Sequence, residues 1–273
     1  MIPGFSAQHL LLRIADASGR WCSKQIRIRS YLVLYSLVCL GSTTLQAQTE
    51  HPGDPLHHDP QLEHESNFFF HAGWDSKYVL EGRDILEDGG LGSVTLEWTT
   101  PTGDNELVLG GWYGEGISAD YSELKLAAAY IIPFETVDMT LSYTWLDFAE
   151  DDFSDNELGI EFGTSVLDSL DLIAAFVYSM DAGGTFIELV ASTEIIQNEF
   201  ALTPYALLGI NQGFISGEHH GLNNLQFGIE AATPLSDSLE LIGYMAYSIA
   251  LDKKHGETLD DIFWVGLGLG FGN

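Results

Sequence analysis

Residues 137–165 have the sequence VDMTLSYTWLDFAEDDFSDNELGIEFGTS, and this stretch decides the fold. Large apolar residues alternate with small or polar ones over 137–148 and again over 156–165, and an acidic connector separates the two parts. A period of two is that of a β-strand, in which successive side chains point to opposite faces. The stretch therefore predicts two strands joined by a loop.

The same alternation recurs from Ser66 to the end of the chain, and no run shows the 3.6-residue period of a helix. Besides the two strands above, the alternating segments are 68–75, 94–99, 106–114, 120–132, 170–178, 185–194, 200–211, 221–232, 239–249 and 261–271. The sequence therefore predicts an all-β protein of about 12 strands.

The connectors between these segments alternate in length. Short ones with turn residues lie at 101–105, 133–136, 166–169, 195–199 and 233–238. Between them lie connectors that are mostly longer, more acidic or richer in glycine, at 81–91, 115–119, 149–155, 179–184, 212–220 and 250–260. This alternation is typical of outer-membrane barrels, which have tight periplasmic turns and longer outer loops.

One face of the predicted strands is apolar. It comprises Leu124, Leu126, Ala128, Tyr130, Val137, Met139, Leu141, Tyr143, Trp145, Leu158, Ile160, Phe162, Ile187, Leu189, Ala191, Leu239, Leu241, Gly243, Met245, Tyr247, Phe263, Val265, Leu267, Leu269 and Phe271. Aromatic residues concentrate near strand ends, as in the aromatic girdles of membrane barrels. A sheet that meets hydrocarbon must pair all its backbone groups, so it has to close on itself. We therefore expect a closed antiparallel transmembrane β-barrel.

The opposite face carries charged residues among glycines and alanines. The candidate pore-lining residues are Lys77, Arg83, Glu97, Glu123, Lys125, Glu157, Glu161, Glu188, Glu230 and Glu240. Buried carboxylates without partners are costly, and too few basic residues are present to pair them all, so the interior is expected to hold water. The three cations either form ordinary ion pairs or create a transverse field that selects permeant ions.

The N-terminal part resembles a secretory signal peptide. Lys24, Arg27 and Arg29 precede an apolar run at 31–40, and LQA at 45–47 offers a cleavage site. We assign 1–47 to the signal peptide, 48–65, with three prolines and four histidines, to a flexible periplasmic linker, and 66–273 to the barrel.

The composition excludes several classes of protein. Removing residues 1–47 takes away five of the ten basic residues and one of the forty acidic ones, which leaves a formal charge of −34. Such a surface does not bind nucleic acid, because it would repel the phosphates. The 15 Phe, 11 Tyr and 6 Trp indicate a folded protein. Both cysteines, Cys22 and Cys39, lie in the signal peptide, so no disulfide is expected.

Catalytic and metal-binding signals are weak. The barrel region has four histidines, His71, His219, His220 and His255, and no spacing that joins one to a nucleophile and an orienting acid. We expect no enzymatic activity. Acidic runs at 81–88 and 150–157 are either solvated charges or sites where divalent cations bridge loops to each other or to lipopolysaccharide.

Two short motifs, DSKYVLEGR at 75–83 and YSEL at 121–124, resemble motifs of the TorF-like porins of Gram-negative outer membranes. DSKYVLEGR at 75–83 is similar to that family's first-strand pattern of Ser, any residue, Tyr, two apolar residues, Arg and Gly, with Glu81 in place of the Arg. YSEL at 121–124 is similar to its Tyr-x-Glu strand entry, and the C-terminal FGN departs from a terminal aromatic residue. The resemblance covers about 66–273 and implies an outer-membrane barrel of porin type with no cofactor.

These features predict a channel in the outer membrane of a Gram-negative cell, through which small cationic or neutral solutes diffuse passively. The expected partners are outer-membrane lipid, lipopolysaccharide and those solutes, and the oligomeric state is left open. Two alternatives are a non-conducting structural or adhesive barrel and a soluble exported β-sandwich that binds carbohydrate.

Overall fold

The computed structural model describes residues 67–251 and 260–272, except 88, 152, 167, 168, 198, 216, 218 and 219. The signal peptide and linker predicted at 1–47 and 48–65 lie outside the described residues, as does most of the last long connector. Within the described part, no helix combines the length and apolar character needed to cross a bilayer.

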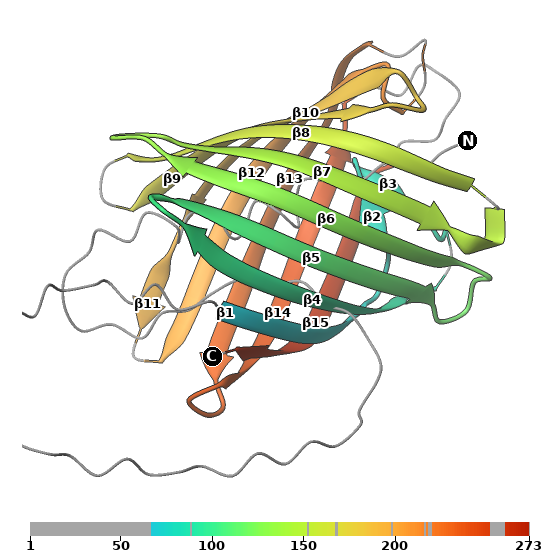
Figure 1. Ribbon diagram of the computed structural model, residues 1–273. Helices are drawn as coiled ribbons and strands as arrows, with labels where there is room; N and C mark the ends of the chain where they lie inside the picture. The colour runs from blue at the N-terminus through green and yellow to red at the C-terminus, as the bar shows by residue number, and fades with distance from the viewer. Residues whose placement is uncertain are drawn as a thin grey trace, which may run out of the picture.

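The structure is a closed antiparallel barrel of twelve strands (Figure 1). They are β1 (Asn67–Asp75), β4 (Leu91–Thr102), β5 (Asn105–Gly116), β6 (Ser122–Pro133), β7 (Asp138–Phe148), β8 (Phe153–Val166), β9 (Leu170–Ser179), β10 (Gly184–Thr193), β12 (Phe200–Gln212), β13 (His220–Pro234), β14 (Leu239–Ala250) and β15 (Ile262–Gly272). Each strand pairs with the next, β10 pairs with β12, and β15 pairs with β1 to close the sheet. The predicted fold is confirmed, and a two-sheet sandwich is excluded.

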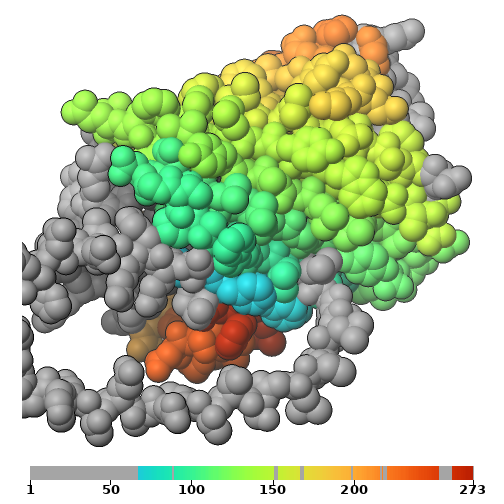
Figure 2. Space-filling view, in the orientation of Figure 1, coloured from blue at the N-terminus to red at the C-terminus, as the bar shows by residue number. Residues whose placement is uncertain are grey.

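The alternation in the sequence becomes the inside and outside of this barrel. On β7 and β8, Leu141 lies opposite Ile160 on the outer face, and the two are 40% and 44% exposed. Thr140 and Glu161, which pair on the same two strands, face inward and are 1% and 2% exposed. In Figure 2 the side chains of β5 to β8 (green) form a continuous surface over the face in view.

Two boundary predictions are wrong, and the reason is the pairing of neighbouring strands. The prediction ends the acidic loop after residue 155, but β8 begins at Phe153, which pairs with Phe148 across a short 3₁₀ turn, η1 (Ala149–Asp151). Polar residues such as Asp155 extend the strand because backbone hydrogen bonds to β7 do not depend on their side chains. The short strand β11 (Ile195–Gln197), predicted as a turn, likewise pairs with β12.

The connector between β1 and β4 does not project outward as the sequence predicts. Residues 76–87, 89 and 90, which we call the lumen segment, fold into the barrel and contain a small hairpin, β2 (Val79–Leu80) and β3 (Arg83–Asp84). Tyr78, Leu80 and Leu86 of this segment are 8% exposed or less. Burying them in the interior removes apolar surface from water, which an outer loop would leave exposed.

Candidate functional site

The candidate site is the interior of the barrel. Eight of the ten residues predicted to line a pore lie on barrel strands, and all eight point inward. Six of them are 7% exposed or less, namely Glu97, Glu123, Lys125, Glu157, Glu161 and Glu188, and Glu230 and Glu240 are half-buried. They come from β4, β6, β8, β10, β13 and β14. Their role in permeation stays a prediction.

The lumen segment is fixed to the wall formed by β5 and β6. The Tyr78 hydroxyl donates to Glu123 Oε2 at 2.6 Å and accepts from Lys125 Nζ at 2.9 Å. Lys125 also pairs with Glu123 at 2.9 Å, and its ammonium lies 4.6 Å from the centre of the Trp112 ring. Burial, and then the charge of Glu123, raises the pKa of Tyr78 well above its ordinary value, so Tyr78 remains a neutral donor.

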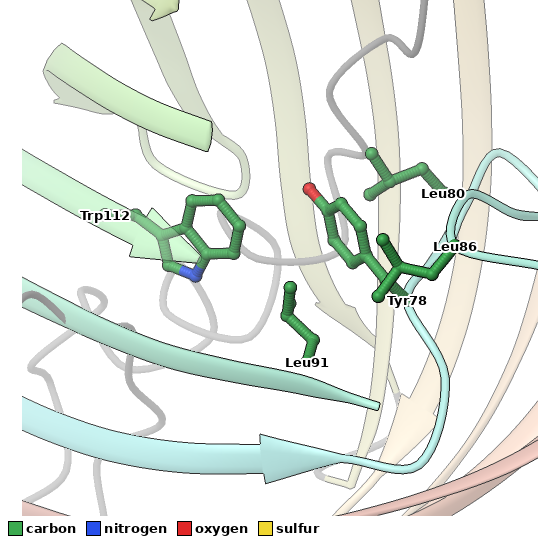
Figure 3. Close-up of a cluster of buried hydrophobic side chains, with 5 residues drawn as sticks. All are labelled: Tyr78, Leu80, Leu86, Leu91 and Trp112. Carbon is green, nitrogen blue, oxygen red and sulfur yellow. The ribbon is translucent and has the colours of Figure 1, made fainter. Parts of the chain in front are cut away.

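Apolar packing surrounds this polar contact. Tyr78, Leu80 and Leu86 of the lumen segment form a buried cluster with Leu91 at the start of β4 and Trp112 on β5 (Figure 3). The Tyr78 and Trp112 rings are stacked, with centres 5.8 Å apart. The segment thus occupies the barrel interior as a packed element.

The same segment also contacts the opposite wall. Asn223 Nδ2, on β13, donates to the Glu81 carbonyl at 2.6 Å. Val79 packs in a second buried cluster with Ala246, Ile262 and Trp264 of β14 and β15. The segment therefore crosses the lumen from the wall formed by β5 and β6 to the wall formed by β13, β14 and β15. A solute path through the barrel would be narrower because of it.

A tight turn makes this crossing compact. Glu81 and Gly82 have φ of 43° and 73°, as in the type I′ turns that join the strands of two-residue hairpins. Arg83 pairs with Glu81 at 2.9 Å, and Lys77 pairs with Asp84. Burial raises the pKa of Glu81 to about 7, although Arg83 favours the charged form. Lys77 and Arg83, two of the predicted pore-lining cations, thus form ion pairs within the segment.

A small cavity lies on the other side of the interior, along β6 to β9. Its volume is about 40 Å³, which is room for about three waters. The lining residues on the inward face are Ala127, Ala129, Ser142, Thr144, Glu157, Gly159, Glu161, Ala175 and Val177. Two of the predicted pore residues, Glu157 and Glu161, therefore share one cavity.

The remaining predicted sites have these positions. His71 lies on β1 with its ring over Gly268 of β15, where an added Cβ would be 1.9 Å from His71 Nε2. Among the described residues, no group of three or more His, Cys, Asp or Glu side chains is placed to hold a metal ion. Parts of both predicted acidic loops, and both His219 and His255, lie outside the described residues.

Sequence reasoning missed the residues that hold the lumen segment. Tyr78 enters the sequence-based prediction only as part of the motif at 75–83, and Trp112 and Asn223 do not enter it. The hydrogen-bond partners of Tyr78 and Asn223 are 45 and 142 residues away in the sequence, so a local pattern does not reveal them. One signal was present: Asn223 and Asn224 stand together within a strand, although Asn is unfavourable there. Both are buried, and β13 is irregular where it pairs with Gly209 and Ile210.

Comparisons with known proteins support the fold. No protein-family model and no curated protein matches the sequence. The solved KdgM porin is similar, with a TM-score of 0.50 and 6% identity over 75% of this chain and 98% of that one. The KdgM porin in complex with disordered oligogalacturonate gives 0.50 at 7% identity with the same coverage, and the NanC porin gives 0.48 at 8% identity. The chain therefore has the barrel fold that porins of the outer membrane share.

Proposed function

We propose that this protein is a porin-like channel of the outer membrane, through which small solutes diffuse passively. The observation that supports it is the closed twelve-stranded barrel, with large apolar side chains outside and charged side chains inside. A polar interior lowers the cost of moving a polar solute through a membrane, and porins have such an interior.

The charges of the lumen favour cationic or neutral solutes. Seven of the eight predicted pore residues on the strands are glutamates, and the one lysine, Lys125, is already paired with Glu123. Carboxylates that line a narrow lumen repel anions. An oligogalacturonate of the kind bound by the similar KdgM porin is a polyanion, so we do not propose it as a solute here.

The other properties follow from this assignment and are also proposals. The protein resides in the outer membrane of a Gram-negative cell, in contact with lipid and lipopolysaccharide, and divalent cations bind its acidic loops. It catalyses no reaction. The two motifs at 75–83 and 121–124 support membership of the TorF-like porins, and both contribute to the contact of Tyr78 with Glu123.

One observation favours a second candidate, a non-conducting structural barrel. The lumen segment crosses the interior and is held on both walls, which leaves a narrow path. We therefore expect a small conductance that increases when the segment is shortened.

Planar bilayer recordings test both candidates. The parent protein should give small steps with cation preference in a potassium chloride gradient. A variant in which a Gly-Ser linker replaces residues 79–84 should give steps several times larger. The control replaces the exposed turn 180–183 in the same way and should leave the steps unchanged. If neither the parent nor the 79–84 variant gives current steps, the structural barrel is supported. A preference for anions would refute the proposed selectivity.

A further inference from the structure

We propose that the cavity along β6 to β9 is a binding site for a small monovalent cation, with Glu161 and Glu157 as its carboxylates. The inference deepens the proposed channel and rests on it for its role in transport. The binding itself rests on the cavity alone.

The cavity is built by the spacing of residues on β8. Glu157 and Glu161 are four residues apart and face inward, and Gly159 between them has no side chain to fill the space. A Cβ at Gly159 would lie 2.2 Å from Ser142 Oγ, so the Ser142 hydroxyl lies directly over this glycine. Two carboxylates and a hydroxyl therefore border one small space.

The Glu161 carboxylate is the group in this space that would bind the cation. Its side chain is 2% exposed, and neither Oε1 nor Oε2 has a hydrogen-bond partner among the described residues. A buried carboxylate in this state is costly. Protonation alone does not remove the cost, because the new hydroxyl would also need an acceptor.

Protein cations do not supply the missing partner. The three lysine and arginine side chains in the described part of the chain, Lys77, Arg83 and Lys125, form ion pairs with Asp84, Glu81 and Glu123. Within the described part of the chain no lysine or arginine is thus left to neutralise Glu161, and a cation from solution can take that place. Water would satisfy the hydrogen bonds of an ionised Glu161 but not its charge.

The donor set indicates the class of cation. Calcium takes six to eight oxygen ligands, usually with several carboxylates, and no described group of three acidic or histidine side chains meets here. A cavity of about 40 Å³ with two carboxylates and hydroxyls from Ser142 and Thr144 fits one monovalent ion, such as an alkali or ammonium ion, with about two waters.

Thermal unfolding in detergent micelles tests the binding without transport. The probe is rubidium chloride, exchanged for N-methylglucamine chloride at constant ionic strength, because N-methylglucamine is too large for the cavity. At about five times the dissociation constant, rubidium should raise the midpoint of the parent by about 2–4 °C. Glu161→Gln should lose this shift, and Ser142→Ala, which keeps the charge, should reduce it.

The control is Glu97→Gln, which removes the same charge from the inward face of β4, outside the cavity. It should keep the rubidium shift of the parent. If rubidium raises the midpoint equally in the parent and in Glu161→Gln, the site is overturned and Glu161 is neutral. If Glu161→Gln and Glu97→Gln lose the rubidium-dependent rise equally, the effect comes from the overall negative charge of the lumen and the site is likewise overturned.

Bilayer recordings separate this inference from the proposed function. In a conducting parent, Glu161→Gln should lower the permeability ratio of rubidium to chloride several-fold more than Glu97→Gln does. A parent that binds rubidium in micelles but never conducts would refute the channel and leave the site. A parent that conducts but shows no Glu161-dependent shift would refute the site and leave the channel.

Discussion

Tyr78 joins the lumen segment to the barrel wall through a single hydroxyl. That oxygen donates to Glu123 and accepts from Lys125, and all three side chains are 3% exposed or less. Tyr78→Phe would remove one partner from each of two buried charges, at a cost of about 1–3 kcal/mol. We expect the segment to leave the wall more often in this variant.

Thiol labelling measures that release. A single cysteine is placed by Val79→Cys, since residues 48–273 contain no other cysteine and Val79 is 8% exposed. Tyr78→Phe should speed its labelling about fivefold or more. Tyr143→Phe is the matched control, because the Tyr143 hydroxyl donates to Asn156 on the outer face. Equal rates in the two variants would contradict the role of Tyr78.

Glu81 predicts how pH affects the same segment. Burial raises its pKa from 4.5 to about 7, so the docked segment binds the proton more tightly than the released one. The protonation of Glu81 therefore favours the docked over the released lumen segment. This contribution is complete below about pH 4.5 and is lost as the pH rises through about 7. Labelling at Val79→Cys should therefore be faster at pH 8 than at pH 5, relative to a free thiol at each pH. Adding Glu81→Gln should remove this dependence, and a rate that falls with pH would contradict it.

At the level of single residues, the sequence predicts which face of the sheet a side chain occupies better than it predicts which residues that side chain contacts. A period of two determines which face a side chain occupies, so Glu157 and Glu161 could be placed inward from the pattern alone. The contact of Tyr78 with Glu123 joins residues 45 positions apart and depends on how the lumen segment folds back. Local patterns carry no information on such a contact.

The hairpin of β2 and β3 depends on Gly82. Its φ is 73°, and an added Cβ would lie 2.7 Å from Asn224 Cγ. Gly82→Ala therefore combines backbone strain of about 1 kcal/mol with a collision against β13. Labelling at Val79→Cys should be faster in this variant.

Gly103→Ala provides the control for backbone strain. Gly103 has φ of 71° in the turn between β4 and β5, and an added Cβ would meet nothing within 4 Å. The strain is then similar, but the lumen segment is not touched. Gly103→Ala should lower barrel stability slightly and leave the labelling rate at Val79→Cys unchanged. If Gly82→Ala and Gly103→Ala both speed this labelling, the cause is a general loss of barrel stability and not the hairpin.

At the level of elements, the sequence predicted the number and order of the barrel strands but not all their ends. The start of β8 was placed at 156 because Ser154 and Asp155 break the apolar alternation. In the structure the ladder with β7 continues to Phe153, since the backbone pairs regardless of side chain. The sequence predicts an outer loop at 81–91, and this is wrong because the length and charge of a connector do not show which way it folds.

The whole molecule has an outer face of large apolar side chains that are exposed in the described part of the chain. Ile160 in the middle of β8 is 44% exposed on that face. In a bilayer, Ile160→Arg should lower the free energy of unfolding by about 2–4 kcal/mol, because a charge would then meet hydrocarbon. Denaturant unfolding in lipid vesicles measures this, with Ile160→Met as control. A loss below about 0.5 kcal/mol, as at a water-exposed surface, would contradict a lipid-facing position.

Sedimentation of the purified protein, with and without detergent micelles, tests most directly whether the outer face of the barrel meets hydrocarbon. We predict a single folded species in micelles, and aggregation when the detergent is removed, because 31 large apolar side chains in the described part of the chain are exposed. A folded monomer that stays monodisperse in buffer without any amphiphile would contradict the account.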